Sequence, residues 1–116
     1  MNVPQAAASA FVRRDGNRFT YLLREDFPAF AGHFPQHPLL PAVAQLVFAV
    51  DAAGRMTGKT LRLACAERAK FTAPVHPGTA YTVTLETGAE GAFKAVFGSE
   101  DGKQYGVAKF TVREVV

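Results

Sequence analysis

The stretch FAGHFPQHPLLPAVAQL, residues 30–46, decides the fold of this 116-residue chain. Pro35, Pro38 and Pro41 fix φ and remove backbone donors, so they stiffen the loop that contains His33. Pro41 also suits the first turn of a helix. The free amides at a helix start favour a partly negative oxygen. The stretch therefore predicts a fixed imidazole beside an anion-binding helix end, an arrangement that suits chemistry next to a carbonyl.

The residues from Leu40 to Ala53 predict one helix, which Gly54 would end. Its side chains are apolar almost all round, so we expect the helix to be buried. Period-two alternation and turn residues predict extended segments at residues 9–14, 18–24, 61–71, 79–87, 92–98 and 104–115. One buried helix beside about six antiparallel strands predicts a single α+β domain over residues 1–116, with the sheet wrapped around the helix.

Hydrophobic residues make up 48% of the chain, yet no apolar run reaches the roughly 18 residues that a membrane helix needs. We therefore expect no membrane association, and the first ten residues lack the features of a secretory signal. The single Cys65 excludes an internal disulfide and fits a reducing cytoplasm. Its alternating apolar surroundings predict an inert thiol in the core.

The net charge of +3 is too small and too dispersed for a nucleic-acid binder. Basic residues nevertheless cluster after the predicted helix, with only Glu67 among them: Arg55, Lys59, Arg62, Arg68 and Lys70. This cluster is either a solvated face or a docking patch for an acidic partner.

Gly32 to Pro35, followed by residues 37–41 and 43–46, resembles the active-site segment of 3-hydroxyacyl-acyl carrier protein dehydratases. Residues 69–78 resemble the second signature of that family, which leads from one long strand into the next. The resemblance implies the hot-dog fold, in which a curved antiparallel sheet wraps a long central helix. The amino-acid sequence of the first segment is most similar to a small branch of the family that is associated with aryl polyene and other specialised acyl chains. We expect the N-terminal helix of larger members to be absent.

In this family the loop histidine handles the proton α to the thioester carbonyl, and amides at the helix start bind the thioester oxygen. The resemblance implies that His33 is the base and that the Ala42 and Val43 amides form the carbonyl site. An α proton is too weakly acidic to remove unless the enolate oxygen is stabilised. The substrate-binding residues implied by the resemblance are Gly32, Phe34, Pro41, Ala42, Val43 and Val47.

Two positions depart from the family pattern. The helix carboxylate that helps the 3-hydroxyl to leave falls on Val47, which cannot transfer a proton, and the usual glycine falls on Ala42. Asp51 is the nearest acid, about one turn further along the same helix face. It is a candidate catalytic residue if the substrate sits deeper or a water bridges the gap. Alternatively, Asp51 is a solvated residue near the helix end.

The favoured interpretation is a hydro-lyase acting on 3-hydroxyacyl thioesters of an acyl carrier protein or coenzyme A, in fatty-acid or polyene-type biosynthesis. It would need no cofactor beyond the phosphopantetheine arm of the substrate, and the histidines are not spaced for a metal site. The alternatives are a hot-dog thioesterase, a binding protein that shelters an acyl chain, and a half-site subunit whose partner supplies the carboxylate. Because hot-dog proteins generally pair, we expect a homodimer, a larger oligomer or a heteromer with another hot-dog subunit.

Overall fold

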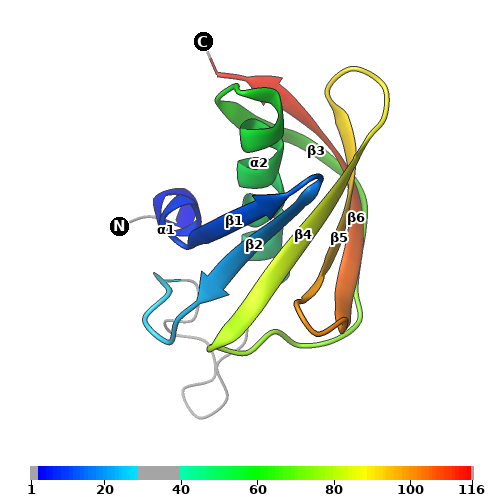
Figure 1. The fold of residues 1–116 in the computed structure, drawn as a ribbon. Coiled ribbons are helices and arrows are strands. Elements are labelled where there is room, and N and C mark those ends of the chain that lie inside the picture. Colours follow the sequence, from blue (N-terminus) through cyan, green and yellow to red (C-terminus); the bar gives the residue numbers. More distant parts are fainter. Residues whose placement is uncertain (1–2, 29–39, 116) are drawn as a thin grey trace.

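A computed structural model describes residues 3–28 and 40–115 (Figure 1). Within them the elements are α1 (Val3–Ser9), β1 (Phe11–Asp15), β2 (Arg18–Leu23), α2 (Ala42–Thr57), β3 (Leu61–Phe71), β4 (Thr79–Thr87), β5 (Ala92–Ser99) and β6 (Gln104–Glu114). The six strands form one antiparallel sheet in the order β1-β2-β4-β5-β6-β3. The sheet curves around α2 (Figure 1). The predicted α+β architecture, a curved antiparallel sheet around one long helix, is confirmed.

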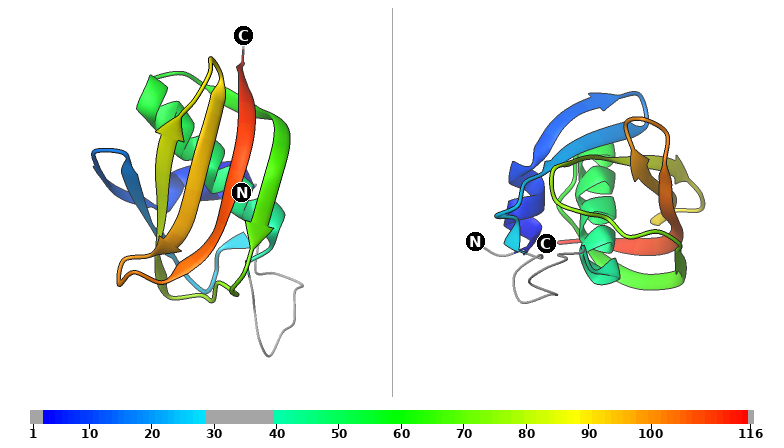
Figure 2. Two further views of the ribbon diagram at one scale, coloured as in Figure 1. Left: turned by 90° about the vertical axis from the view of Figure 1, so that its right-hand side faces the viewer. Right: turned by 90° about the horizontal axis from the view of Figure 1, so that it is seen from below.

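The sheet is built from hairpins and one long crossover. β1 and β2 turn at Gly16, whose positive φ of 62° fits the predicted turn chemistry. After α2 the chain continues into β3, which crosses to the far edge and pairs with β6 from Leu61 opposite Glu114 to Phe71 opposite Gly106. Figure 2 shows β3 and the β1–β2 hairpin at opposite sides of the sheet. The two edge strands of the described sheet are therefore β1 and β3.

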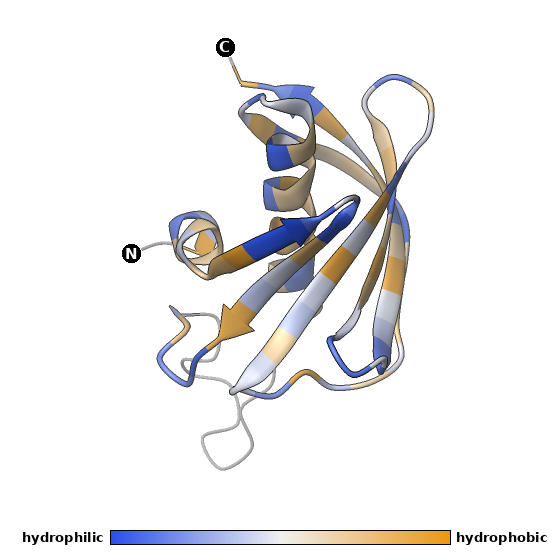
Figure 3. Ribbon diagram, in the orientation of Figure 1, coloured by the Kyte–Doolittle hydropathy of each residue, from blue (hydrophilic) through white to orange (hydrophobic). Residues whose placement is uncertain are grey.

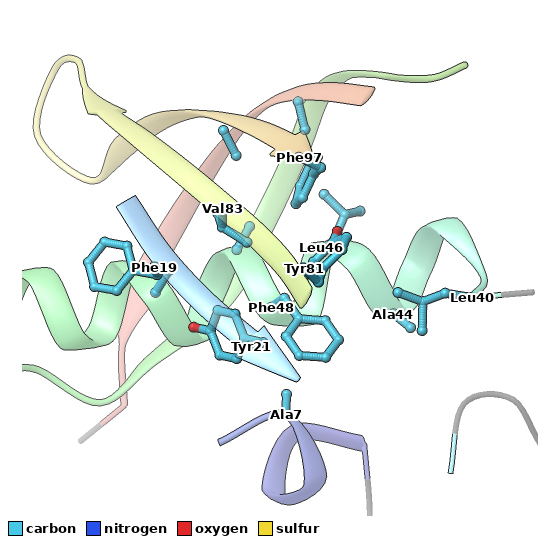
Figure 4. Packing of buried hydrophobic residues seen from close by; sticks show 14 of the residues in the cluster. Ala7, Phe19, Tyr21, Leu40, Ala44, Leu46, Phe48, Tyr81, Val83 and Phe97 are labelled. Carbon is cyan, nitrogen blue, oxygen red and sulfur yellow. The ribbon is translucent and has the colours of Figure 1, made fainter. Parts of the chain in front are cut away.

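Aromatic rings hold α2 against the sheet. The ring of Phe48, which is fully buried, lies 4.8 Å from that of Tyr21, 5.3 Å from Phe27 and 5.2 Å from Tyr81, measured between centroids. Figure 4 shows Phe48 reaching from α2 between Tyr21 of β2 and Tyr81 of β4. Edge-to-face, stacked and tilted ring pairs of this kind add to the gain from burying their area. This aromatic cluster fixes which face of α2 turns toward the sheet.

The helix α2 ends later than predicted. It continues to Thr57, and Gly58, with φ of 72°, is its C-cap and donates its N–H to the Gly54 carbonyl at 2.8 Å. The predicted stop at Gly54 is therefore wrong. A Cβ on Gly54 would lie 2.9 Å from the carbonyl oxygen of Lys59, so this glycine is needed where the chain folds back over the helix.

An N-terminal helix is present, and its expected absence is wrong. Pro4 stands at the start of α1, where its missing N–H is harmless, and Ala6, Ala7 and Ala8 favour a helix. Ala6 and Ala7 are buried in the main core. In Figure 4 Ala7 faces the rings of the aromatic cluster. Small side chains let α1 approach the core closely.

The strand β3 is exposed along almost its whole length. Every residue from Arg62 to Lys70 is exposed, and only the two end residues are half-buried. The predicted core position of Cys65 is therefore wrong, because the thiol lies on an exposed edge strand. No helix in residues 3–28 or 40–115 is long and apolar enough to span a membrane.

Gly106 allows β6 to pass close to β3. A Cβ there would lie 2.6 Å from the Lys70 carbonyl oxygen and 2.7 Å from Cδ1 of Phe71. We expect Gly106→Ala to lower the free energy of unfolding by about 1–3 kcal/mol, because the backbone must move, as measured by urea denaturation. The control is Gly88→Ala, whose Cβ would meet nothing closer than 3.7 Å. Equal unfolding midpoints for the two variants would contradict this packing.

Candidate functional site

Two backbone amides at the start of α2 have no acceptor among residues 3–28 and 40–115. Pro41 is the N-cap residue, with extended φ and ψ of −64° and 152°, and makes no side-chain cap. Its carbonyl accepts hydrogen bonds from the amides of Ala44 and Gln45 at 3.1 and 3.2 Å. Within the described part of the chain, the amides of Ala42 and Val43 have no acceptor. These two N–H groups therefore concentrate partial positive charge where the helix begins.

Three predicted site residues, Gly32, His33 and Phe34, lie outside the described residues. The described chain resumes at Leu40, whose N–H donates to the carbonyl of Val75 at 2.9 Å. Leu40 belongs to the first segment that resembles the dehydratases, and Val75 belongs to the second. The backbone therefore joins the two segments directly at the approach to α2.

An open apolar groove of about 690 Å³ runs between α2 and β3. Its apolar walls come from both elements and from α1: Val43, Leu46, Val47, Val50, Leu61, Leu63 and Pro4. Val43 is 74% exposed, so the prediction that α2 is buried all round is wrong. The groove brings together three predicted site residues, since Val43, Val47 and Asp51 all line it.

Asp51 lies in this groove and is held by two side chains. Its Oδ2 accepts a hydrogen bond from the Tyr21 hydroxyl at 2.7 Å and another from Nε of Arg55 at 2.8 Å. The Asp51 side chain is only 17% exposed, so it is not a solvated residue at the helix end. Its place in catalysis stays a prediction.

Arg55 links Asp51 to the N-terminal elements. Its guanidinium carbon lies 3.8 Å from the centre of the Phe11 ring, and its Nη2 donates to the Ala8 carbonyl at 3.0 Å. Arg55 therefore joins α2 to α1 and β1, and it is not part of a purely solvated basic face. The four-residue spacing from Asp51 to Arg55 is the sequence signal for this ion pair.

Tyr21 is the member of the site that the sequence did not reveal. Burial, and then the neighbouring Asp51 carboxylate, raise the pKa of Tyr21 well above its ordinary value. The hydroxyl therefore stays protonated and donates to Asp51. Since the two residues lie thirty positions apart in the chain, no local pattern marks the pair.

Gln45 lies on the opposite side of α2 from the groove. Its Oε1 accepts a hydrogen bond from the Tyr81 hydroxyl at 2.8 Å, and both residues are buried. This bond satisfies two polar groups inside an aromatic core. Gln45 belongs to the segment that resembles the dehydratases, yet in this structure it faces the core of the domain.

Strand pairing creates a row of cations that the sequence did not show. Arg68 of β3 lies opposite Lys109 of β6, and Lys109 lies opposite Lys94 of β5. All three side chains are exposed. Because of this pairing, the predicted basic cluster extends across the sheet instead of staying between helix and strand. Such a row of like charges facing each other across strands is unfavourable.

The comparisons with known proteins agree with this geometry. The ApeI-like family model, described as ApeI dehydratase, matches residues 12–109. Since the match covers most of the sequence, the chain belongs to the ApeI-like dehydratase family. This result confirms the resemblance to hot-dog 3-hydroxyacyl-acyl carrier protein dehydratases that the active-site segment indicated.

Related sequences include enzymes named 3-hydroxyacyl-[acyl-carrier-protein] dehydratase FabZ. One from a Polaromonas species is 37% identical over 79 residues, and one from Thermus thermophilus is 39% identical over 82 residues. These matches cover 58% and 62% of this chain, and 54% and 56% of the relatives. The chain therefore spans about half the length of the curated relatives it matches.

Solved structures share the fold. The dehydratase heterocomplex ApeI:P from Xenorhabdus doucetiae matches with a TM-score of 0.76 at 20% identity, over 88% of this chain and 95% of that chain. The E. coli PaaI protein from the phenylacetic acid degradation operon matches with a TM-score of 0.62 at 13% identity, over 96% of this chain and 89% of that chain. The predicted hot-dog fold is confirmed.

The bond between Tyr21 and Asp51 is expected to appear in the pH dependence of stability. Because the pKa of Tyr21 is raised in the folded state, the native chain keeps a proton that the unfolded chain releases above about pH 10. The resulting stabilisation is fully present below about pH 10 and is lost as the pH rises above that value.

We expect Tyr21→Phe to lower the free energy of unfolding near neutral pH by about 1.5–3 kcal/mol, because a hydrogen bond to a carboxylate is removed. Above about pH 10 the wild-type chain should lose stability more steeply than the variant, by about 1.4 kcal/mol per pH unit. Urea denaturation across alkaline pH measures both effects. Parallel pH profiles for the two chains would contradict a raised pKa of the Tyr21 hydroxyl.

Proposed function

We propose that this chain is a dehydratase subunit acting on 3-hydroxyacyl thioesters. The observation that carries the proposal is the pair of amides at Ala42 and Val43, which have no acceptor among the described residues and stand at the helix end beside an apolar groove lined by Val43 and Val47. A thioester oxygen fits the amides, and an acyl chain fits the groove. The FabZ relatives are named as enzymes of this reaction, and the chain belongs to a dehydratase family.

In the proposed reaction His33 removes the proton from C2 of the substrate. The Ala42 and Val43 amides hold the thioester oxygen while negative charge develops on it, which lowers the barrier to enolate formation. The C3–O bond then breaks, a C2–C3 double bond forms, and the hydroxyl leaves as water after it receives a proton. Gly32, Phe34 and Pro41 are proposed to shape the loop and the mouth of the groove around the thioester.

The proton for the departing hydroxyl needs an acid, and Val47 cannot supply it. Asp51 is the carboxylate that lines the groove within the described residues. Its Oδ2 is held by Tyr21 and Arg55, whereas Oδ1 has no partner in residues 3–28 and 40–115. We therefore propose that the Asp51 carboxylate holds a water at Oδ1, and that the proton taken up by His33 passes through this water to the departing hydroxyl.

The substrate is proposed to arrive on the phosphopantetheine arm of an acyl carrier protein or of coenzyme A. The exposed row of Arg68, Lys109 and Lys94 suits an acidic carrier. The reaction consists of proton transfers and the loss of water, so no metal or redox cofactor enters the proposal. The single Cys65 supports a location in the reducing cytoplasm.

Turnover of a short 3-hydroxyacyl thioester by the purified chain tests the proposal. We expect an enoyl product, with a rate that falls by a factor of about 10² or more in His33→Ala, because the base is lost. Free thiol is followed in parallel. Thiol release without enoyl product would identify a thioesterase, and the absence of both products would show that the chain alone is not a dehydratase.

The missing helix carboxylate is open to a direct test. Val47 lines the groove at the position where the dehydratases are expected to carry their acid. We expect Val47→Glu to raise the dehydration rate by about tenfold or more, because a carboxylate there can protonate the departing hydroxyl. Val50→Glu is the matched control, since Val50 lines the same groove three residues further on. Equal rates in both variants would exclude Val47 as the position of the missing acid.

A further inference from the structure

The groove between α2 and β3 is apolar along one half and charged at one end. Its walls beside the start of α2 consist of apolar side chains such as Val43 and Val47. We call the other part the charged end of the groove, because four charged residues from the last turns of α2, the turn after it and the start of β3 line it: Asp51, Arg55, Lys59 and Arg62. A long ligand in the groove therefore meets apolar side chains first and charges only at the charged end.

The charged end carries positive charge that the chain itself does not neutralise. Arg55 and Asp51 offset each other, with Nε and Oδ2 2.8 Å apart. Nζ of Lys59 lies 3.9 Å from Oε1 of Glu114, and both side chains are more than half exposed, so this pair contributes little. Arg62 makes no ion pair within residues 3–28 and 40–115. An anionic group at the charged end therefore meets two available cations, Lys59 and Arg62.

Strand pairing increases this positive charge. Arg62 of β3 lies opposite Arg113 of β6, and both side chains are exposed. Figure 3 shows the residues at the end of β6 as strongly hydrophilic. Two like charges that lie opposite each other on paired strands repel. An anion bound beside Arg62 would reduce this repulsion, so the charged end favours an anionic ligand.

The length of α2 sets the length of a ligand that reaches the charged end. Lys59 donates its backbone N–H to the Gly54 carbonyl at 3.2 Å, so its backbone lies beside Gly54. Gly54 follows Val43 by eleven residues, which corresponds to about 17 Å along the helix axis. An extended chain advances by about 1.2 Å per bond, so about fourteen bonds cover this distance.

We propose that the groove accepts 3-hydroxyacyl chains of about fourteen carbons that end in a carboxylate, and that Lys59 and Arg62 bind this carboxylate. The apolar carbons of the chain lie against Val47 and Val50 of α2 and Leu63 of β3. Lys59 and Arg62 are exposed, so the carboxylate keeps part of its hydration and the cost of burying a charge is small. The position of the thioester at the start of α2 rests on the proposed function, whereas the preference of the charged end for an anion does not.

The phosphate groups of a phosphopantetheine arm or of coenzyme A are a second source of negative charge. An arm that lay in the groove would place its amide groups against valine and leucine side chains, which offer them no hydrogen bonds. The apolar walls suit the hydrocarbon of an acyl chain instead. The charged end is therefore assigned to the tail of the acyl chain.

Binding of chains that cannot be dehydrated tests this inference. The probes are pantetheine thioesters of saturated acyl chains that lack the 3-hydroxyl and are about fourteen or about eight carbons long. Each chain ends in a carboxylate or in its methyl ester, and calorimetric titration measures the dissociation constants. We expect the longer carboxylate to bind about five times as tightly as its methyl ester at low salt, with a smaller preference at high salt. The shorter pair should show no preference, because its carboxylate does not reach the charged end.

The double variant Lys59→Gln/Arg62→Gln removes both cations and should abolish the preference for the carboxylate. The matched control is Lys94→Gln/Lys109→Gln, which removes two exposed cations from β5 and β6 and should keep the preference. Equal binding of the two longer chains by the wild-type protein, or a preference that survives the loss of Lys59 and Arg62, overturns the proposal. A coenzyme A thioester that gains affinity from these two cations, when the carboxylate tail gains none, also overturns it, because the charged end would then bind the phosphates of the arm.

Turnover of the 3-hydroxy forms of the two longer chains separates this inference from the proposed function. A binding preference together with faster dehydration of the carboxylate-ended chain supports both. A binding preference without enoyl product from either chain supports the charged end and contradicts the proposed reaction. Dehydration of both chains without a binding preference supports the reaction and contradicts the charged end.

Discussion

The insertion of Phe48 between Tyr21, Phe27 and Tyr81 is the contact on which the rest of the structure depends. It seats α2 in the curve of the sheet and fixes the rotation of the helix about its own axis. With that rotation set, Gln45 turns inward to the Tyr81 hydroxyl and Val47 turns outward to the groove. The first amides of α2 and the apolar face beside them are therefore placed by aromatic packing on the other side of the helix.

Much of the sheet was predictable, because its signals are local. The bounds predicted for β3 and β4 match the structure at both ends, since side-chain alternation and the flanking prolines and glycines mark them. The errors have a common cause in tertiary contacts. Gly54 looks like a helix end until the chain returns over it at Lys59. The sequence predicted that Cys65 and the outer face of α2 are buried, because an apolar pattern does not show whether another element covers the apolar residues.

The candidate site was likewise predictable only in its local features. Pro41 marks the helix start and hence the first amides of α2, and the spacing along α2 places Val47 and Asp51 on one face. The hydrogen bond that holds Asp51 comes from Tyr21, which lies on a strand distant in sequence. The spacing of residues along the chain therefore could not predict this bond. Asp51, which the sequence presented as a candidate acid, is thus part of the contacts that join α2 to β2 and α1. A residue in this position holds the fold together whatever its role in the site.

The crossover of β3 to the far edge of the sheet also shapes how the chain is made. β3 is complete at Phe71, but its neighbour in the sheet does not begin until Gln104. During synthesis from the N-terminus, β3 therefore emerges with both edges unpaired, and it stays so until the last strand has been added. Nascent chains with unpaired strands are prone to misassembly. We expect the charges of Arg62, Arg68 and Lys70 to disfavour contacts between neighbouring nascent chains until β6 has formed.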